Sequence, residues 1–133
     1  MYADMQFDYR QMEQIRDGLE HDLALEQIQI YADPKFHYMD MEQIREGFEE
    51  GLSIEQVKCY ANPNFDSDQM EQIRLGFRED GITVEQAKVM ADPRFNEDLM
   101  LALRGAFKMG YSEDEINELI GYMAEDELDM GGI

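Results

Sequence analysis

Residues 41–65, MEQIREGFEEGLSIEQVKCYANPNF, are one copy of a unit that recurs along the 133-residue chain and decides its fold. The opening motif of the unit, MEQIR, starts at Met12, Met41 and Met70, with a looser copy, MLALR, at Met100. The closing motif, Ala-Asp/Asn-Pro-x-Phe, starts at Ala32, Ala61 and Ala91. The clear MEQIR copies are 29 residues apart, an interval typical of proteins built from stacked helical repeats.

The first half of the unit has the apolar spacing of a helix. Met41, Ile44 and Phe48 fall at positions i, i+3 and i+7, so they lie on one helical face. Asp40 is suited to cap the start of this helix and Gly51 to end it. We therefore predict a first helix over roughly 40–50.

The second half of the unit predicts a shorter helix over roughly 53–61. Ser53 is a favourable N-cap, and Ile54, Val57 and Tyr60 follow at helical spacing. Pro63 ends the segment, because the residue before a proline is pushed out of the helical region. We expect Phe65, in the connector, to anchor one unit against the next.

The same pattern in the other copies predicts an all-α fold over residues 1–133. We expect four tandem hairpins of about 29 residues stacked as a short α-solenoid, with a compact eight-helix bundle as the alternative. The units are 8–36, 37–65, 66–95 and 96–124, followed by an acidic C-terminal tail, 125–133. Residues 3–7 are a degenerate closing motif, so we expect Phe7 to take the anchor role of Phe65.

Two further residues recur inside the first helix of each unit. Glycines at Gly18, Gly47 and Gly76 weaken a helix by about 1 kcal/mol each relative to alanine, so their recurrence indicates close approach of a neighbour. Arginines recur at Arg16, Arg45, Arg74 and Arg104. The simplest role for these arginines is to favour the helix C-terminus or bond nearby carbonyls, and a clamp between units is the alternative.

The composition limits the kinds of partner. The formal net charge is −20, from 31 acidic and 11 basic residues, which argues against direct binding of nucleic acid or anionic membranes. It permits a basic protein or divalent cations, or is only a solvated surface. The single cysteine, Cys59, permits no intramolecular disulfide, and neither an 18-residue apolar run nor a signal peptide is present. We therefore expect a cytoplasmic protein.

Motifs for catalysis and cofactor binding are missing from the sequence. The two histidines, His21 and His37, do not have metal-ligand spacing, and no P-loop, GxSxG, GxGxxG or HExxH motif occurs. Asp66-Ser67-Asp68 begins like a calcium loop but lacks its later glycine and glutamate, so we interpret it as a helix cap. We expect no enzyme, no cofactor and no metal site.

Acidic residues crowd the predicted C-terminal ends of the first helices, where carboxylates are unfavourable. Stacked units would align them along one edge, about 10 Å apart, a spacing that imitates nucleic-acid phosphates. Lys108 interrupts this row. We predict that the edge binds a basic partner, in a sharper version as a nucleic-acid mimic that inhibits a DNA- or RNA-binding enzyme. The predicted partner-binding residues are Glu20, Asp22, Glu46, Glu49, Glu50, Glu79, Asp80, Glu113 and Asp114.

The motifs MEQIRxGF and YADPxF, as in residues 41–48 and 31–36, resemble a short acidic helical repeat of bacterial proteins, mainly of Firmicutes and their mobile elements. The resemblance covers Tyr2 to about Met123. It implies a helical-repeat fold in a bacterial cytosol, and a mobile-element origin favours the mimic. The alternatives to a basic partner are self-assembly through apolar surface near Phe7 or Met123, and a divalent-cation-binding protein.

Overall fold

The computed structural model describes the backbone of residues 7–132 and the side chains of residues 7–123. Within this part of the chain it contains eight α-helices and no strand, which confirms the all-α prediction. The helices are α1 (Tyr9–Glu20), α2 (Leu25–Tyr31), α3 (Tyr38–Glu49), α4 (Ile54–Lys58), α5 (Ser67–Asp80), α6 (Val84–Met90), α7 (Glu97–Lys108) and α8 (Glu113–Gly132). Residues 3–6 of the degenerate first motif and the side chains of the acidic tail lie outside the described residues.

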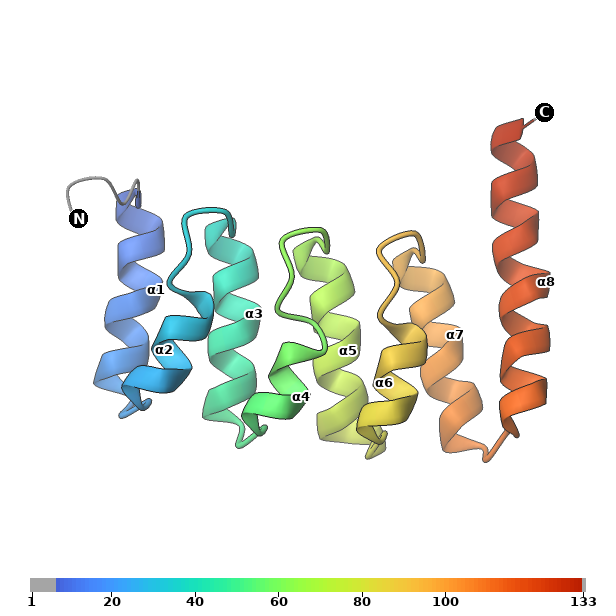
Figure 1. Cartoon of the computed structure of the whole chain (residues 1–133), viewed down its shortest axis with the longest axis horizontal. Helices are drawn as coiled ribbons and strands as arrows, with labels where there is room; N and C mark the ends of the chain where they lie inside the picture. Colours follow the sequence, from blue (N-terminus) through green and yellow to red (C-terminus); the bar gives the residue numbers. More distant parts are fainter. Residues whose placement is uncertain (1–6, 133) are drawn as a thin grey trace.

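The long helices α1, α3, α5 and α7 lie side by side in one row and run in the same direction (Figure 1). The short helices α2, α4 and α6 lie across one face of this row, and loops return the chain to the start of the next long helix (Figure 1). α8 closes the row and runs opposite to α7 (Figure 1). Each unit therefore contacts mainly its neighbours in sequence, and the C-terminal ends of the long helices share one edge.

Helix starts follow the predicted capping chemistry, with one correction. Ser53 caps α4, and its hydroxyl accepts from the Gln56 amide. The prediction that Asp40 caps the first helix of the template unit is wrong. The helix begins at Tyr38 and ends at Glu49, and His37 is its N-cap. Asp40 lies three residues beyond the cap, and its carboxylate accepts from the His37 amide at 3.3 Å.

The second helix of the template unit is shorter than predicted. α4 ends at Lys58, because the next amides bond carbonyls three residues back instead of four: Cys59 bonds Gln56, and Tyr60 bonds Val57. This tightening turns the chain toward Pro63 before a further α-helical turn forms.

The helix stops are placed as predicted. Gly51 has φ +94°, in the left-handed region where glycine carries no side-chain penalty. In the first unit Asp22 takes the same place with φ 64°, and it is the one non-glycine residue with positive φ among the described residues. A left-handed conformation costs a residue with a side chain about 1–2 kcal/mol, so this turn is less favourable than the one at Gly51.

The recurring glycines make room for a side chain from the second half of the same unit. Tyr31 and Tyr60 are fully buried, and their hydroxyls donate to the carbonyl oxygens of Gln14 and Gln43, each at 2.9 Å. A Cβ on Gly47 would overlap the Tyr60 hydroxyl. The close neighbour that the glycines indicated is therefore a tyrosine. In the third unit an isoleucine, Ile82, packs against Gly76 instead.

The apolar positions of the repeat form one continuous core. In the template unit Met41, Ile44, Phe48 and Phe65 are buried, and Phe7 is half-buried against the same core. Among the described residues, no helix combines the length and apolar character needed to traverse a lipid bilayer.

Candidate protein-interaction surface

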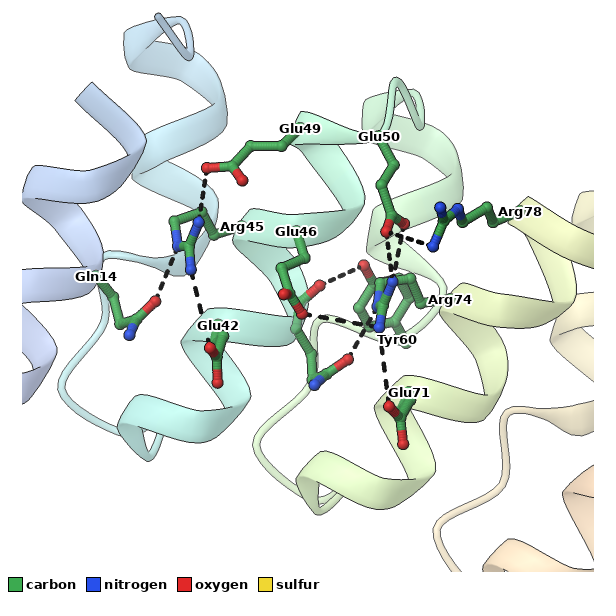
Figure 2. Close-up of polar contacts among 11 residues, drawn as sticks. Gln14, Glu42, Arg45, Glu46, Glu49, Glu50, Tyr60, Glu71, Arg74 and Arg78 are labelled. Atoms are coloured by element: carbon green, nitrogen blue, oxygen red, sulfur yellow. Dashed lines mark hydrogen bonds and ion pairs between the residues drawn. The ribbon is translucent and has the colours of Figure 1, made fainter. Parts of the chain in front are cut away.

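The recurring arginines join consecutive units. Arg74 of α5 extends back to α3, where its Nε donates to Gln43 Oε1 at 2.9 Å (Figure 2). One terminal nitrogen, NH1, donates to both carboxylate oxygens of Glu50, at 2.7 and 2.9 Å. The Arg74 side chain is only 7 % exposed. This contact is the clamp between units that the sequence left as the alternative.

The next interface repeats the clamp with a shifted acid. Arg104 of α7 donates from Nε to Asp80 at 2.6 Å and from NH1 to Gln72 at 2.7 Å. A longer contact, 3.3 Å, reaches Glu79. The third unit is one residue longer than the second, and Asp80 is the residue inserted before Gly81. This inserted residue supplies the carboxylate that lies closest to Arg104.

At the first interface, between α1 and α3, the arginine bonds an acid of its own helix. Arg45 donates to Gln14 at 2.9 Å, but its acid is Glu49 of its own helix, at 2.7 Å (Figure 2). His21, 29 residues before Glu50, lies across the interface with Nδ1 2.7 Å from Glu49 Oε2. The sequence predicted no role for His21. The available signal was that His21 occupies, in the first unit, the repeat position that Glu50 occupies in the second. Arg16 differs from the others: it is 65 % exposed, and its ion pairs within the described residues are with Glu13 and Glu20 on its own helix.

Two acids at the clamps have shifted pKa values, in opposite directions. Burial opposes ionisation of Glu49, but hydrogen bonds from Arg45 and His21 outweigh it and hold its pKa below the ordinary value. Burial raises the pKa of Glu46, and Arg74, 3.7 Å away, only partly offsets this effect.

The predicted partner-binding residues differ in how far they are paired with arginines. The C-terminal helix ends share one edge, as expected (Figure 1). The acids that pair with clamp arginines are Glu46, Glu49, Glu50, Glu79 and Asp80. Glu20 makes a loose pair with Arg16 at 3.7 Å. Asp22, Glu113 and Asp114 form no ion pair with any described residue. Binding of a partner by these nine acids stays a prediction.

Unpaired acids meet exposed apolar side chains between α6 and α8. A cavity of about 340 Å³ lies there, lined by Glu85, Gln86, Val89, Phe107, Tyr111, Glu113, Ile116 and Asn117. A second cavity, of about 310 Å³, adjoins it at Tyr111 and is lined by Tyr111, Glu115, Glu118, Leu119 and Tyr122. We call the two together the terminal groove.

The terminal groove combines aromatic surface with negative charge. Tyr111 is 42 % exposed, and Val89 and Tyr122 are also exposed. The carboxylates of Glu85 and Glu113 have no cationic partner among residues 7–123. Sequence reasoning placed Glu113 in the site but missed its apolar surroundings. The exposed tyrosines near the end of the repeat were the only signal for them.

One group of acids has the geometry of a metal site without further support. Oxygens of Asp68, Glu71 and Glu97 lie within 4.8 Å of one another. Asp68 and Glu97 are exposed, Glu71 lies 3.9 Å from Arg74, and Glu97 accepts a long hydrogen bond from Gln72 at 3.5 Å. Solvent and these neighbours account for the group without an ion.

Comparison with family models, curated proteins and solved structures finds no match for this chain.

Proposed function

We propose that this protein is a non-enzymatic interaction module that binds a basic protein partner in the terminal groove. The observation that supports the proposal most directly is the combination, in one groove, of exposed Val89 and Tyr111 with the unpaired carboxylates of Glu85 and Glu113. Apolar and aromatic side chains supply most of the affinity at protein interfaces, and charges at the rim supply orientation and speed of encounter.

The rest of the surface supports the same class of partner. The short helices α2, α4 and α6 lie on one face of the row (Figure 1). Each has a glutamate in its first turn: Glu26, Glu55 and Glu85. All three are exposed. The chain as a whole has a net charge of −20, which attracts a cationic segment and repels nucleic acid, although Lys58 and Lys88 lie on the same short helices.

The clamps argue for a peptide-like partner over nucleic-acid mimicry. A mimic needs a row of free carboxylates, whereas Glu50, Asp80 and Glu49 each share their charge with an arginine. We therefore assign these acids to the contacts that hold the units together, and we do not propose mimicry.

The test uses a short fluorescein-labelled peptide that alternates Leu and Lys, measured by fluorescence anisotropy. Glu113→Lys should weaken binding about tenfold, a change of about 1.4 kcal/mol, and Tyr111→Ala should do the same through lost contact area. The matched control is Glu13→Lys, which makes the same charge change on exposed α1, outside the groove.

The control separates a site from bulk attraction. We expect Glu13→Lys to leave the affinity within about twofold of the parent. If Glu13→Lys and Glu113→Lys weaken the peptide equally, or if Tyr111→Ala has no effect, the groove is not the binding site.

A further inference from the structure

Two glutamines hold the connectors between units by the same pair of hydrogen bonds. Gln11, the third residue of α1, donates from Nε2 to the carbonyl oxygens of Pro34 and Phe36, at 3.2 and 2.7 Å. Gln69, the third residue of α5, donates likewise to Pro93 and Phe95, at 3.0 and 2.7 Å. In both units one amide nitrogen satisfies two main-chain oxygens at the start of the next long helix.

The unit between them has an aspartate in this position. Asp40 is the third residue of α3, 29 residues from both Gln11 and Gln69. The carbonyls at the corresponding connector positions belong to Pro63 and Phe65. An ionised carboxylate accepts hydrogen bonds and cannot donate them. Neither carbonyl oxygen has a hydrogen-bond donor among the described residues, so three acceptor groups occur where the other units pair donor with acceptor.

Asp40 is buried and incompletely satisfied. The residue is 8 % exposed. The one hydrogen bond that its carboxylate accepts from the described residues is from the His37 amide to Oδ2, at 3.3 Å. Burial raises the pKa of Asp40, and the nearby Asp66 adds to this effect against His37, which opposes it. No side-chain polar atom of the described residues is both fully buried and without a hydrogen-bond partner, so the second oxygen of Asp40 is open to solvent and to a donor on a ligand.

These groups line one open cavity of about 530 Å³. Its walls are partly apolar, with Met39, Pro63, Phe65 and Pro93, and its polar groups include Asp40 and Asp66. No lysine or arginine lines it. The cavity therefore combines acceptor groups, two carboxylates and the imidazole of His37 with apolar surface.

We propose that this cavity binds a primary ammonium group, such as the lysine side chain of a partner, between Asp40 and the carbonyl oxygens of Pro63 and Phe65. An ammonium has three N–H donors, one for each of the three acceptor groups, and so replaces the glutamine amide of the other units. The apolar walls suit the alkyl stem of lysine. A metal ion such as calcium needs six or more oxygen ligands, more than this set supplies.

The test is a titration of the ¹⁵N-labelled protein with Nα-acetyl-lysine-N-methylamide, followed by ¹H–¹⁵N correlation spectra at low salt. We expect saturable shifts of the amide signals of His37, Asp40, Asn64 and Asp66, with a millimolar dissociation constant. The norleucine analogue, which has no ammonium, should give no saturable shift. This site does not depend on the terminal groove, so either proposal can fail alone.

The decisive variant is Asp40→Gln, which restores the glutamine of the neighbouring units. It should weaken the lysine analogue about tenfold or more, as expected for loss of hydrogen bonds to a charged group. The control is Asp68→Asn, which removes an exposed acid outside the cavity and should leave binding unchanged. If Asp40→Gln does not fold, Asp40→Asn removes the same charge with less change of shape.

Three results would overturn the proposal. The first is equal binding of the lysine analogue by Asp40→Gln, or by Asp40→Asn, and the parent. The second is no saturable shift at these residues, which would mean that water or a proton on Asp40 satisfies the acceptors. The third is a saturable response to CaCl₂ but not to the lysine analogue, which would make the cavity a metal site.

Discussion

The clamp between α3 and α5 gives the sharpest prediction for stability. Arg74→Ala removes three hydrogen bonds, one to Gln43 and two to Glu50, from a side chain that is 7 % exposed. Removing one partner of a buried charge pair costs about 3–5 kcal/mol. Glu50 is 21 % exposed and keeps Arg78 at 3.2 Å. Water and Arg78 recover part of this loss, so we expect Arg74→Ala to destabilise the fold by about 2–4 kcal/mol.

Arg16→Ala is a matched control, because Arg16 occupies the same repeat position without a clamp. It is 65 % exposed and lies 3.6 and 3.7 Å from Glu13 and Glu20. Exposed pairs of this kind contribute about 0–1 kcal/mol. The change in helix propensity is the same in both variants, so the difference between them isolates the clamp.

The assay is urea denaturation followed by far-ultraviolet circular dichroism at neutral pH. With slopes of about 1–3 kcal/mol per molar urea, Arg74→Ala should lower the midpoint by roughly 1–2 M and Arg16→Ala by a few tenths. If the two variants differ by less than about 1 kcal/mol in free energy of unfolding, the arginine clamp does not hold the units together.

Three other predictions concern local features. Gly47→Ala should destabilise the fold by about 1–3 kcal/mol, because its Cβ would overlap the Tyr60 hydroxyl. Gly105→Ala, in open space within α7, should instead stabilise the fold by up to about 1 kcal/mol. Equal urea midpoints for the two variants would contradict the packing around Gly47. Asp22→Gly should raise the melting temperature, because it relieves a positive φ worth about 1 kcal/mol, and a lowered value would count against it. Folding lowers the pKa of Glu49, so its ionised form stabilises the protein above its ordinary pKa of 4.5, and this contribution is lost as pH falls through the lowered value. Glu49→Gln should therefore flatten the acid side of the stability–pH profile, and an unchanged profile would refute the linkage.

The hairpins were predictable from sequence because their signals are local. Apolar spacing such as that of Met41, Ile44 and Phe48 specifies a helix face, and glycine and proline specify its end. The start of α3 was misjudged, because His37 is an uncommon cap and Asp40 is a common one.

The clamps were not predictable from one helix at a time. Glu50 looks unfavourable at the end of its own helix, and the arginine that compensates it lies 24 residues away, in the next unit. The terminal groove was missed for a related reason. It arises where the long helix α8 takes the place of the short second helix of the other units, so its walls, such as Val89 and Tyr111, come together only through packing.

The arginine clamp between α3 and α5 uses positions that the template unit also carries. The additional pair of Glu50 with Arg78, at 3.2 Å, has no counterpart there, because Glu49 occupies the position of Arg78. If residues 37–65 were copied and inserted after Phe65, Arg45 of the copy would face Gln43 and Glu50 of the original, as Arg74 does now. The copy's own Gln43 and Glu50 would in turn face Arg74. Duplication of one short stretch of the gene would therefore lengthen the row by one more unit held by the same arginine clamp, so the length of this chain can change in steps of one unit.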